Sequence, residues 1–407
     1  MRLLILMMSF YFLGTLGTLA QEISEASRFA AVDAHVAKVS KEFVYHPQAL
    51  AKNLSDNLTN DYDKVRAYYV WIAKNIKYDF LAYIHEDIGS KSVLEITRSG
   101  KTLCTGFSLL FAYFCEQTGI EVEIIEGYAK GYGYKKGEKF KKTNHSWNAV
   151  NIYGTWYLVD VTWATGDPRK FAAHEKTIDV DTYFLTDPKK FIKSHLPEDP
   201  TWQLLDQKIS LEEFESNQYE NKHKWIYNSW SPNDYDNLDE YETDLLYYKR
   251  AMEFSQRDRS ICTHLSFAYL YKGISLTDNL WKMTAHELYA SQDSLSTQFY
   301  AYMDSALQTS QKLKYLRSVT HLRIINDEIN YQSGVFNYEL GVEFFSKGDI
   351  MNQEALSSED LVATYFDIAK NHFSNVVESS IYHRDANEYL VLIDEFRRRN
   401  PVVAKPD

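Results

Sequence analysis

The stretch HSWNAVNIYGTWYLVDVTW, residues 145–163, holds two runs of strand-forming residues on either side of the dipeptide Tyr153-Gly154. Aromatic and β-branched residues in partial polar and apolar alternation are typical of strands, and a glycine-containing dipeptide between two such runs is typical of a hairpin turn. The pattern therefore predicts two antiparallel strands, over 145–152 and 156–162.

His145 opens the first predicted strand, and Asp160 lies near the end of the second. In an antiparallel pair, opposed residues share a face and their numbers add to a constant. A two-residue turn at 153–154 and a four-residue turn over 151–154 both give an odd sum, as do the numbers of His145 and Asp160. Their side chains are therefore predicted to project from one face, opposed or diagonal, within reach of each other. A turn with an even sum would place them on opposite faces.

Upstream, the segment LCTGFSLLFAYFCEQ, residues 103–117, is largely apolar and predicts a helix, with Thr102 as candidate N-cap and Gly119 suited to its end. Cys104 then lies about one residue into the helix. At that position the unpaired N–H groups and the helix dipole lower the pKa of a thiol, and the thiolate is the form that attacks carbonyl groups.

Cys104, His145 and Asp160 thus follow one another in settings that suit a nucleophile, its general base and the carboxylate that orients the base. Taken singly, a cysteine at a helix start and a histidine in a strand are usually packing residues. The three together, with their local sequences, form a specific pattern. Cys115, three turns down the helix, and Cys262, inside a later predicted helix, are interpreted as structural.

These segments resemble the transglutaminase-like superfamily. The matching segments are residues 100–108, 145–150 and 154–163, with 64–79 similar to the helix that precedes the core in bacterial members. Residues 183–205 are similar to the branch that includes kyphoscoliosis peptidase and fungal cytokinesis proteins. The resemblance covers roughly residues 45–215 and does not extend to the second half of the chain.

The resemblance implies a papain-like core in which Cys104 is the nucleophile, His145 the base and Asp160 its orienter. The chemistry implied is acyl transfer from an amide carbonyl of a protein or peptide substrate through a thioester. Hydrolysis is preferred, since water outcompetes amines unless a site excludes it. The alternatives are a protein–protein transamidase, or a non-catalytic scaffold that binds partners through its helical half.

The remaining parts of the proposed site follow from the same resemblance. The backbone N–H of Cys104 is one oxyanion donor at the helix start. The second donor is unassigned, because Leu103 stands where the family more usually has glycine. Trp71, Trp163 and His195 are interpreted as structural. The sequence contains no metal-binding Cys/His spacing and no phosphate loop, the calcium sites of animal transglutaminases have no evident counterpart, and no cofactor is expected.

A chain of 407 residues exceeds the usual size of a single core, so we expect two domains. The expected organisation is a signal peptide at 1–20, an α+β transglutaminase-like domain at 21–227, a linker at 228–244 and an all-α domain at 245–407. Six amphipathic segments predict the helices of the last part, and two of them weakly resemble tetratricopeptide helices. The six segments are 245–254, 261–270, 303–313, 335–345, 361–377 and 386–396.

Residues 1–20 carry Arg2, an apolar run and small residues before Gln21, which is typical of a cleaved signal peptide. A retained membrane anchor is the alternative, and no later stretch is long and apolar enough to span a bilayer. We therefore expect an exported protein, periplasmic or secreted. The net charge of −12 argues against binding to nucleic acid. Three cysteines in an exported chain leave at least one free thiol or an intermolecular bridge.

Overall fold

The computed structural model describes residues 29–85, 89, 91–166, 178–217, 230–256, 258–315, 319–347 and 358–403. The predicted signal peptide at 1–20 lies outside the described residues. The chain divides into two compact units, Met1–Ser231 and Pro232–Asp407. A search of the helices in the described residues finds none with the length and apolar character needed to cross a membrane.

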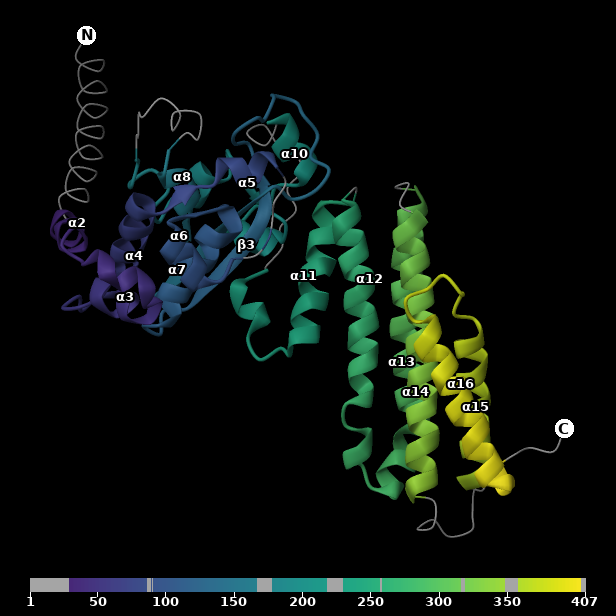
Figure 1. The fold of residues 1–407 in the computed structure, drawn as a ribbon. Coiled ribbons are helices and arrows are strands. Elements are labelled where there is room, and N and C mark those ends of the chain that lie inside the picture. The colour runs from purple at the N-terminus through teal and green to yellow at the C-terminus, as the bar shows by residue number, and fades with distance from the viewer. Residues whose placement is uncertain are drawn as a thin grey trace, which may run out of the picture. The chain divides into compact units, whose positions relative to one another are not determined.

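The first unit combines helices with two small sheets, which confirms the predicted α+β class (Figure 1). Its helices are α2 (Ala30–Val36), η1 (Lys41–Tyr45), α3 (Pro47–Leu54), α4 (Asp61–Asn75), α5 (Phe80–Ile84), α6 (Val93–Ser99), α7 (Cys104–Glu116), α8 (Val161–Ala164), α9 (Pro188–Phe191), η3 (Pro200–Gln203) and α10 (Leu211–Ser216). Its strands are β1 (Lys77–Tyr78), β2 (Lys101–Thr102), β3 (Val122–Ala129), β4 (His145–Ile152), β5 (Thr155–Val159) and β6 (His195–Pro197).

The larger sheet has four antiparallel strands in the order β5-β4-β3-β6, and β1 and β2 form a separate parallel pair. Helix α7 packs against β3 and β4 on one side and against α4 on the other (Figure 1). Val150 and Ile152 of β4 belong to the core between the sheet and these helices. Trp147 and Ala149 belong to a second cluster on the opposite face, because successive residues of a strand point to opposite sides.

The turn between β4 and β5 has two residues, so β5 pairs with β4 from Ile152↔Thr155 to Asn148↔Val159. Tyr153 and Gly154 have φ angles of 55° and 84°, which the tight hairpin turns that match strand twist require. Glycine adopts this conformation readily. Tyr153 is held there by its hydroxyl, which accepts a hydrogen bond from the Asp61 N–H at 3.1 Å. The register is therefore one of the two predicted with an odd sum.

Strand β5 ends at Val159, so the prediction of a strand to Thr162 is wrong at its C-terminal end. The reason is that the side chain of Asp160 caps a new helix, α8, by accepting a hydrogen bond from the Trp163 N–H at 3.1 Å. Aspartate is among the preferred N-cap residues, and its capping turns the chain out of the sheet here.

The described residues of the second unit form helices without strands. Five of the six predicted helical segments lie within helices, and the sixth, 361–377, extends three residues beyond the end of its helix at Ser374. These helices are α11 (Glu240–Phe254), α12 (Arg259–Ile274), α13 (Ala285–Tyr315), α14 (Val319–Lys347), α15 (Ser358–Ser374) and α16 (His383–Arg399), with short η5 (Pro232–Tyr235), η6 (Ser275–Thr277), η7 (Leu280–Lys282) and η9 (Pro401–Val403). Helix α11 begins inside the stretch expected as a linker, because the side chain of Asp239 caps it.

Helices α14 and α15 pack closely because small residues of α14 face aromatic rings of α15. A Cβ at Gly341 would lie 2.7 Å from the Phe366 ring, and one at Gly334 would lie 2.6 Å from the Phe373 ring. Helices α13 and α14 have 31 and 29 residues. Two helices of this length exceed a tetratricopeptide repeat, which fits a helix pair into about 34 residues.

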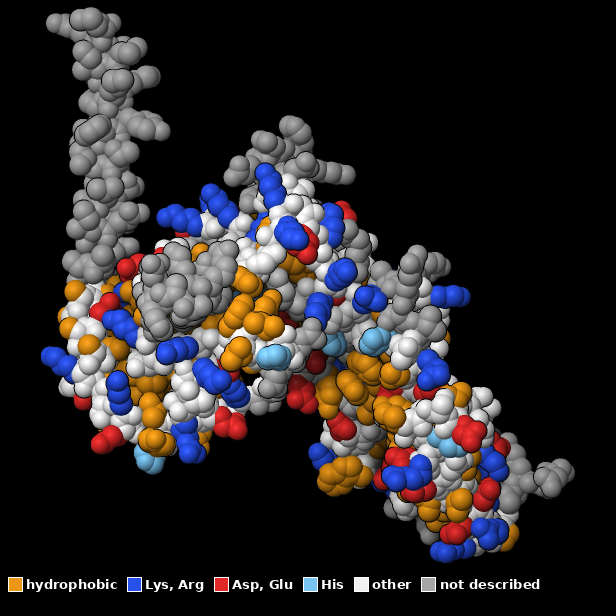
Figure 2. All heavy atoms as spheres, turned by 45° about the horizontal axis from the view of Figure 1, so that its top comes forward, with side chains coloured by type: hydrophobic (Ala, Val, Ile, Leu, Met, Phe, Trp, Pro, Cys, Tyr) orange, Lys and Arg blue, Asp and Glu red, His pale blue; other side chains and the backbone are white. Residues whose placement is uncertain are grey.

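The visible face of the molecule shows acidic and basic side chains interspersed, with apolar side chains among them (Figure 2).

Candidate active site

Cys104 is the first residue of α7, directly after β2 and Leu103. The prediction of Thr102 as N-cap is wrong: Leu103 occupies that position, and no side chain caps the helix. Thr102 instead pairs with Tyr78 in the parallel β1–β2 bridge, and its side chain packs where a Cβ of Gly106 would lie, at 1.9 Å from Oγ1. The glycine thus lets the first turn of α7 approach β2, which fixes the position of Cys104.

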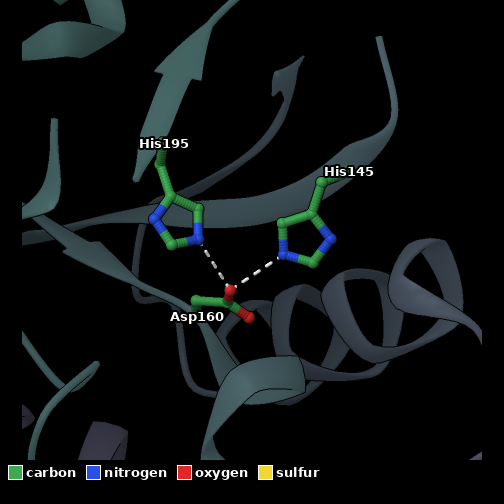
Figure 3. A group of neighbouring side chains, drawn as sticks. All are labelled: His145, Asp160 and His195. Carbon is green, nitrogen blue, oxygen red and sulfur yellow. Dashed lines mark hydrogen bonds and ion pairs between the residues drawn. The ribbon is translucent and has the colours of Figure 1, made fainter. Parts of the chain in front are cut away.

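His145 and Asp160 meet across the β4–β5 hairpin, with Nε2 of His145 at 2.8 Å from Oδ2 of Asp160 (Figure 3). The carboxylate is fully buried, and the imidazole side chain is 8% exposed. In the observed register Asp160 falls opposite Trp147, which lies two residues after His145. His145 and Asp160 are therefore diagonal neighbours on one face of the sheet. The strand parity argued from the sequence and the observed contact agree.

His195 also reaches Asp160, with its Nε2 at 3.0 Å from the same Oδ2 atom (Figure 3). It lies in β6, which pairs with β3 through Ala129↔His195, and it is fully buried. The sequence interpretation of His195 as structural missed this contact. No local pattern could have revealed it, because His195–Pro197 is a strand of three residues that reaches this place by pairing with β3.

Asp160 accepts N–H groups on both carboxylate oxygens. Oδ1 accepts from the Trp163 backbone, and Oδ2 lies within hydrogen-bond distance of His145 and His195. Burial by itself raises the pKa of Asp160, but the charge of His145 and the hydrogen bonds from both histidines outweigh it and hold this pKa well below its usual range. Asp160 is therefore ionised, and its carboxylate can accept a hydrogen bond from the N–H of each imidazole.

Cys104 and His145 shift each other's protonation. Burial opposes the charge of the imidazolium, but the charge of Asp160, its hydrogen bond and the Cys104 interaction raise the pKa of His145 to about 10. Burial likewise raises the pKa of Cys104. The hydrogen bond and charge of His145, together with backbone hydrogen bonds from Ser146 and Thr105, outweigh it and lower this pKa. The arrangement favours a thiolate beside an imidazolium.

Residues 48–161 match the family model of the transglutaminase-like superfamily. The first unit contains a transglutaminase-like domain. This bears out the resemblance noted in the sequence, because the match includes the three residues that carried it.

Curated relatives match part of this chain. This chain is 36% identical over 185 residues to kyphoscoliosis peptidase of Homo sapiens, covering 43% of this chain and 28% of that protein. It is 30% identical over 209 residues to hillarin of Drosophila melanogaster, covering 48% and 25%. It is 24% identical over 185 residues to cytokinesis protein 3 of Schizosaccharomyces pombe, covering 45% and 20%. The chain thus spans about a quarter of the length of the curated relatives it matches.

A solved structure titled "Crystal structure of a TGase" is similar over 38% of this chain and 43% of that chain. Its identity of 18% and TM-score of 0.24 are too low to bear on the fold or the site.

The other two cysteines of the described residues, Cys115 and Cys262, are both buried. Cys115 is fully buried in α7, and burial raises its pKa well above the usual value. Cys262 is fully buried in α12, where burial raises its pKa to about 11 and its Sγ donates to the Thr309 carbonyl at 3.2 Å. Both thiols are protonated at neutral pH.

Aromatic rings surround the two histidines that contact Asp160, His145 and His195. The Trp163 ring centroid lies 5.8 Å from that of His145 and 4.2 Å from that of His195. Trp147 lies 6.0 Å from the His145 ring, and it fits there because Gly127 has no side chain: a Cβ would lie 2.5 Å from the indole. Trp71 is 4% exposed and packs on Phe114 in the core, away from these rings. The site is thus walled by rings that shield its charges from water.

His145, Asp160 and His195 form the one group within the described residues whose donor atoms cluster as metal ligands could. Two imidazoles and a carboxylate are also a donor set of zinc sites. Here, however, each Nε2 lies at hydrogen-bond distance from Oδ2, so both imidazole protons already have an acceptor. Hydrogen bonding satisfies the group by itself, and we derive no metal chemistry from it.

Proposed function

We propose that the transglutaminase-like domain is a cysteine enzyme that transfers acyl groups from amide carbonyls. In this proposal Cys104 is the nucleophile, His145 the general base and Asp160 the carboxylate that orients it. The observation that carries the proposal is the shared imidazole: Nε2 of His145 lies 2.8 Å from Asp160, while the same ring lowers the pKa of Cys104.

The proposed reaction begins with attack of the Cys104 thiolate on the carbonyl carbon of a substrate amide. The new C–S bond pushes the carbonyl electron pair onto oxygen, and the backbone N–H of Cys104 at the start of α7 is placed to stabilise that charge. The C–N bond then breaks, and the His145 imidazolium gives its proton to the departing amine. A thioester on Cys104 and a neutral imidazole remain.

Water completes the proposed cycle. Neutral His145 takes a proton from water as its oxygen attacks the thioester carbonyl, and the C–S bond breaks to return the thiolate. A carboxylic acid leaves, so the net reaction is hydrolysis of a peptide bond. An amine in place of water would make the enzyme a transamidase. We favour hydrolysis of protein or peptide substrates because water is the more abundant acceptor wherever a site does not exclude it.

A thiol-reactive probe applied to the intact protein at pH 6 tests the activated nucleophile. An ordinary thiol of pKa about 8.5 is only about 0.3% thiolate at this pH, so rapid alkylation of Cys104 is expected only if His145 holds its proton. Peptide mapping assigns the label. Cys104→Ala should remove it and His145→Ala should slow it. A wild-type rate equal to that of a free thiol, unchanged in His145→Ala, contradicts the proposal and leaves the non-catalytic scaffold.

A peptide-cleavage profile identifies the acyl acceptor. The chain from Gln21 onward is incubated with a set of peptides, with and without an added primary amine. Hydrolysis predicts cleaved peptides with free carboxylates whether or not the amine is present. A transamidase predicts amine-linked products that replace them. Cys104→Ala is the control for both activities, because both require the thioester and it cannot form without the thiol.

We also propose export of the protein, on the sequence pattern of residues 1–20 alone. N-terminal sequencing of protein recovered from culture medium or periplasm is expected to begin at Gln21. A chain that keeps Met1 and stays with the membrane fraction would support the retained anchor instead.

A further inference from the structure

The mechanism proposed above leaves one fully buried histidine without a task. His195 comes from β6, on the far side of β3 from His145. The two imidazoles reach one carboxylate oxygen from two sides, at 2.8 Å for His145 and 3.0 Å for His195 (Figure 3). Oδ2 of Asp160 is therefore within hydrogen-bond distance of both imidazoles, and a carboxylate oxygen can accept two such bonds.

Packing alone does not account for a histidine at this position. The imidazole of His195 stacks on Phe191 with centroids 4.1 Å apart and lies 4.2 Å from the Trp163 ring. An apolar ring would fill this space without the cost of burying two polar nitrogens. Both nitrogens of His195 are instead within hydrogen-bond distance of a partner: Nε2 of Asp160, and Nδ1 of the Ser194 hydroxyl at 2.9 Å.

The partners fix the protonation of His195. An ionised carboxylate only accepts hydrogen bonds, so Nε2 carries the proton, and Nδ1 then accepts from the Ser194 hydroxyl. Burial and the neighbouring charge of His145 lower the pKa of His195, although Asp160 and a hydrogen bond with the Phe191 backbone oppose the shift. Two imidazoliums on one carboxylate would repel each other. His195 is therefore a neutral donor, and the transferable proton stays with His145.

A neutral second donor on Oδ2 restricts the carboxylate. The terminal torsion of an aspartate is broad when nothing holds it. The Trp163 N–H on Oδ1 and the His195 N–H on Oδ2 fix both oxygens in the orientation that His145 needs. We infer that His195 is a positioning residue that holds Oδ2 of Asp160 in line with Nε2 of His145. The inference rests on the proposed function, since it concerns the orientation of the proposed base.

The test compares His195→Phe, which keeps the ring and loses the donor, with His195→Gln, whose amide can present an N–H near the Nε2 position. Both are measured in the full chain as the rate of Cys104 alkylation at pH 6. We expect His195→Phe to slow alkylation by roughly 10-fold to 100-fold, the effect seen when partners that orient histidine ligands are removed. His195→Gln should stay within about 3-fold of wild type.

A double substitution separates positioning from a general loss of structure. If His195 acts through Asp160, adding His195→Phe to Asp160→Asn should not slow alkylation further, because coupled residues are not additive. Ser194→Ala is the mild variant: it removes the partner of Nδ1 only and should slow alkylation by about 2-fold to 5-fold, a loss of the size of one neutral hydrogen bond. Thermal melting of each variant shows whether it is folded.

The outcomes distinguish this inference from the proposed function. A wild-type rate equal to that of an ordinary thiol overturns the proposed function itself. A fast wild type with His195→Phe and His195→Gln equally fast overturns the positioning role alone. So does a further slowing of the Asp160→Asn protein by His195→Phe. A folded His195→Phe that is slow, with Gln restoring the rate, supports it.

Discussion

Helix α7 carries a cysteine at each end, and the surroundings shift the pKa of the two thiols in opposite directions. Cys104 is its first residue and partly exposed, with His145, Ser146 and Thr105 contributing the interactions that lower its pKa. Cys115 lies one residue before the end, fully buried, with a pKa raised well above the usual value. Both have the same helix and the same side chain. Only the surroundings of the sulfur differ.

The comparison shows that burial by itself does not decide the reactivity of a thiol. Burial raises the pKa of both cysteines, and at Cys104 the N–H donors and the imidazolium outweigh it. A helix start offers unpaired N–H groups, whereas the last turn offers carbonyl oxygens that repel a thiolate. Removing the partners of Cys104 one at a time tests which of them cause its pKa to differ from that of Cys115.

The largest effect is expected from the thiols themselves. Cys104→Ala should reduce peptide turnover by roughly 10⁴-fold or more, since the residual catalysis of such sites comes from binding and the oxyanion donors alone. Cys115→Ala is the matched control in the same helix. It should leave turnover within about 2-fold and cost roughly 1 kcal/mol of unfolding free energy. A Cys115→Ala protein that folds but has lost turnover would reverse the comparison.

Asp160→Asn should come next, with turnover reduced by roughly 10³-fold to 10⁴-fold because the imidazole is then held in the wrong tautomer. Asparagine is as good an N-cap as aspartate, so the cap of α8 is expected to survive. Turnover and thermal melting are measured together. Alkylation of Cys115 in denaturant serves as the internal control and should not change. Full turnover in a folded Asp160→Asn protein would remove Asp160 from the proposed site.

The pH dependence of alkylation is expected to separate wild type from His145→Ala. The pKa of Cys104 is lowered and that of His145 is raised to about 10, so the thiolate–imidazolium pair exists between the two values. It is lost as pH falls through the Cys104 pKa, because the thiolate is then protonated. In His145→Ala the rate should rise about 10-fold per pH unit from pH 6 to 8, as for a thiol of pKa about 8.5. The wild-type rate should rise less steeply; equal slopes would contradict the pair.

The smallest effects concern the glycines near the two ends of α7. Gly106→Ala places a Cβ at 1.9 Å from Thr102 Oγ1 and should cost about 1–3 kcal/mol by overpacking. Gly119→Ala meets no atom within 4 Å but has a φ of +70°, which should cost about 1–2 kcal/mol. Stability alone hardly separates the two. Alkylation at pH 6 should: only Gly106→Ala displaces the first turn, so only its rate is expected to fall.

The sequence predicted the site as far as its local patterns reached. The odd sum of residue numbers across Tyr153-Gly154 predicted that His145 and Asp160 share a face, and they are in contact at 2.8 Å. The apolar run at 103–117 predicted a helix with Cys104 about one residue into it, and α7 begins at Cys104. The family resemblance was likewise readable in three short segments, and it is confirmed by the family model.

The predictions that were wrong concern residues whose partners are set by competing interactions. Thr102 has the side chain of an N-cap, but β1–β2 pairing and contact with Gly106 take it into a strand. The second strand of the hairpin was expected to reach Thr162, but the Asp160 side chain caps α8 and ends it at Val159. At Thr102 a local preference lost to tertiary contacts. At Asp160 one local preference, helix capping, overrode another, the strand pattern of the residues around it.

The sequence by itself determined the hairpin, the helix of Cys104 and the order of Cys104, His145 and Asp160, because strand and helix periodicities are local properties of the chain. The tertiary structure decided what the thiol and the carboxylate encounter. Strand β6 returns to the sheet beside β3 and brings His195 within 3.0 Å of Oδ2 of Asp160, a residue 35 positions earlier in the chain. Such a contact, and the protonation states that follow from it, depend on strand order and burial, which no local pattern carries.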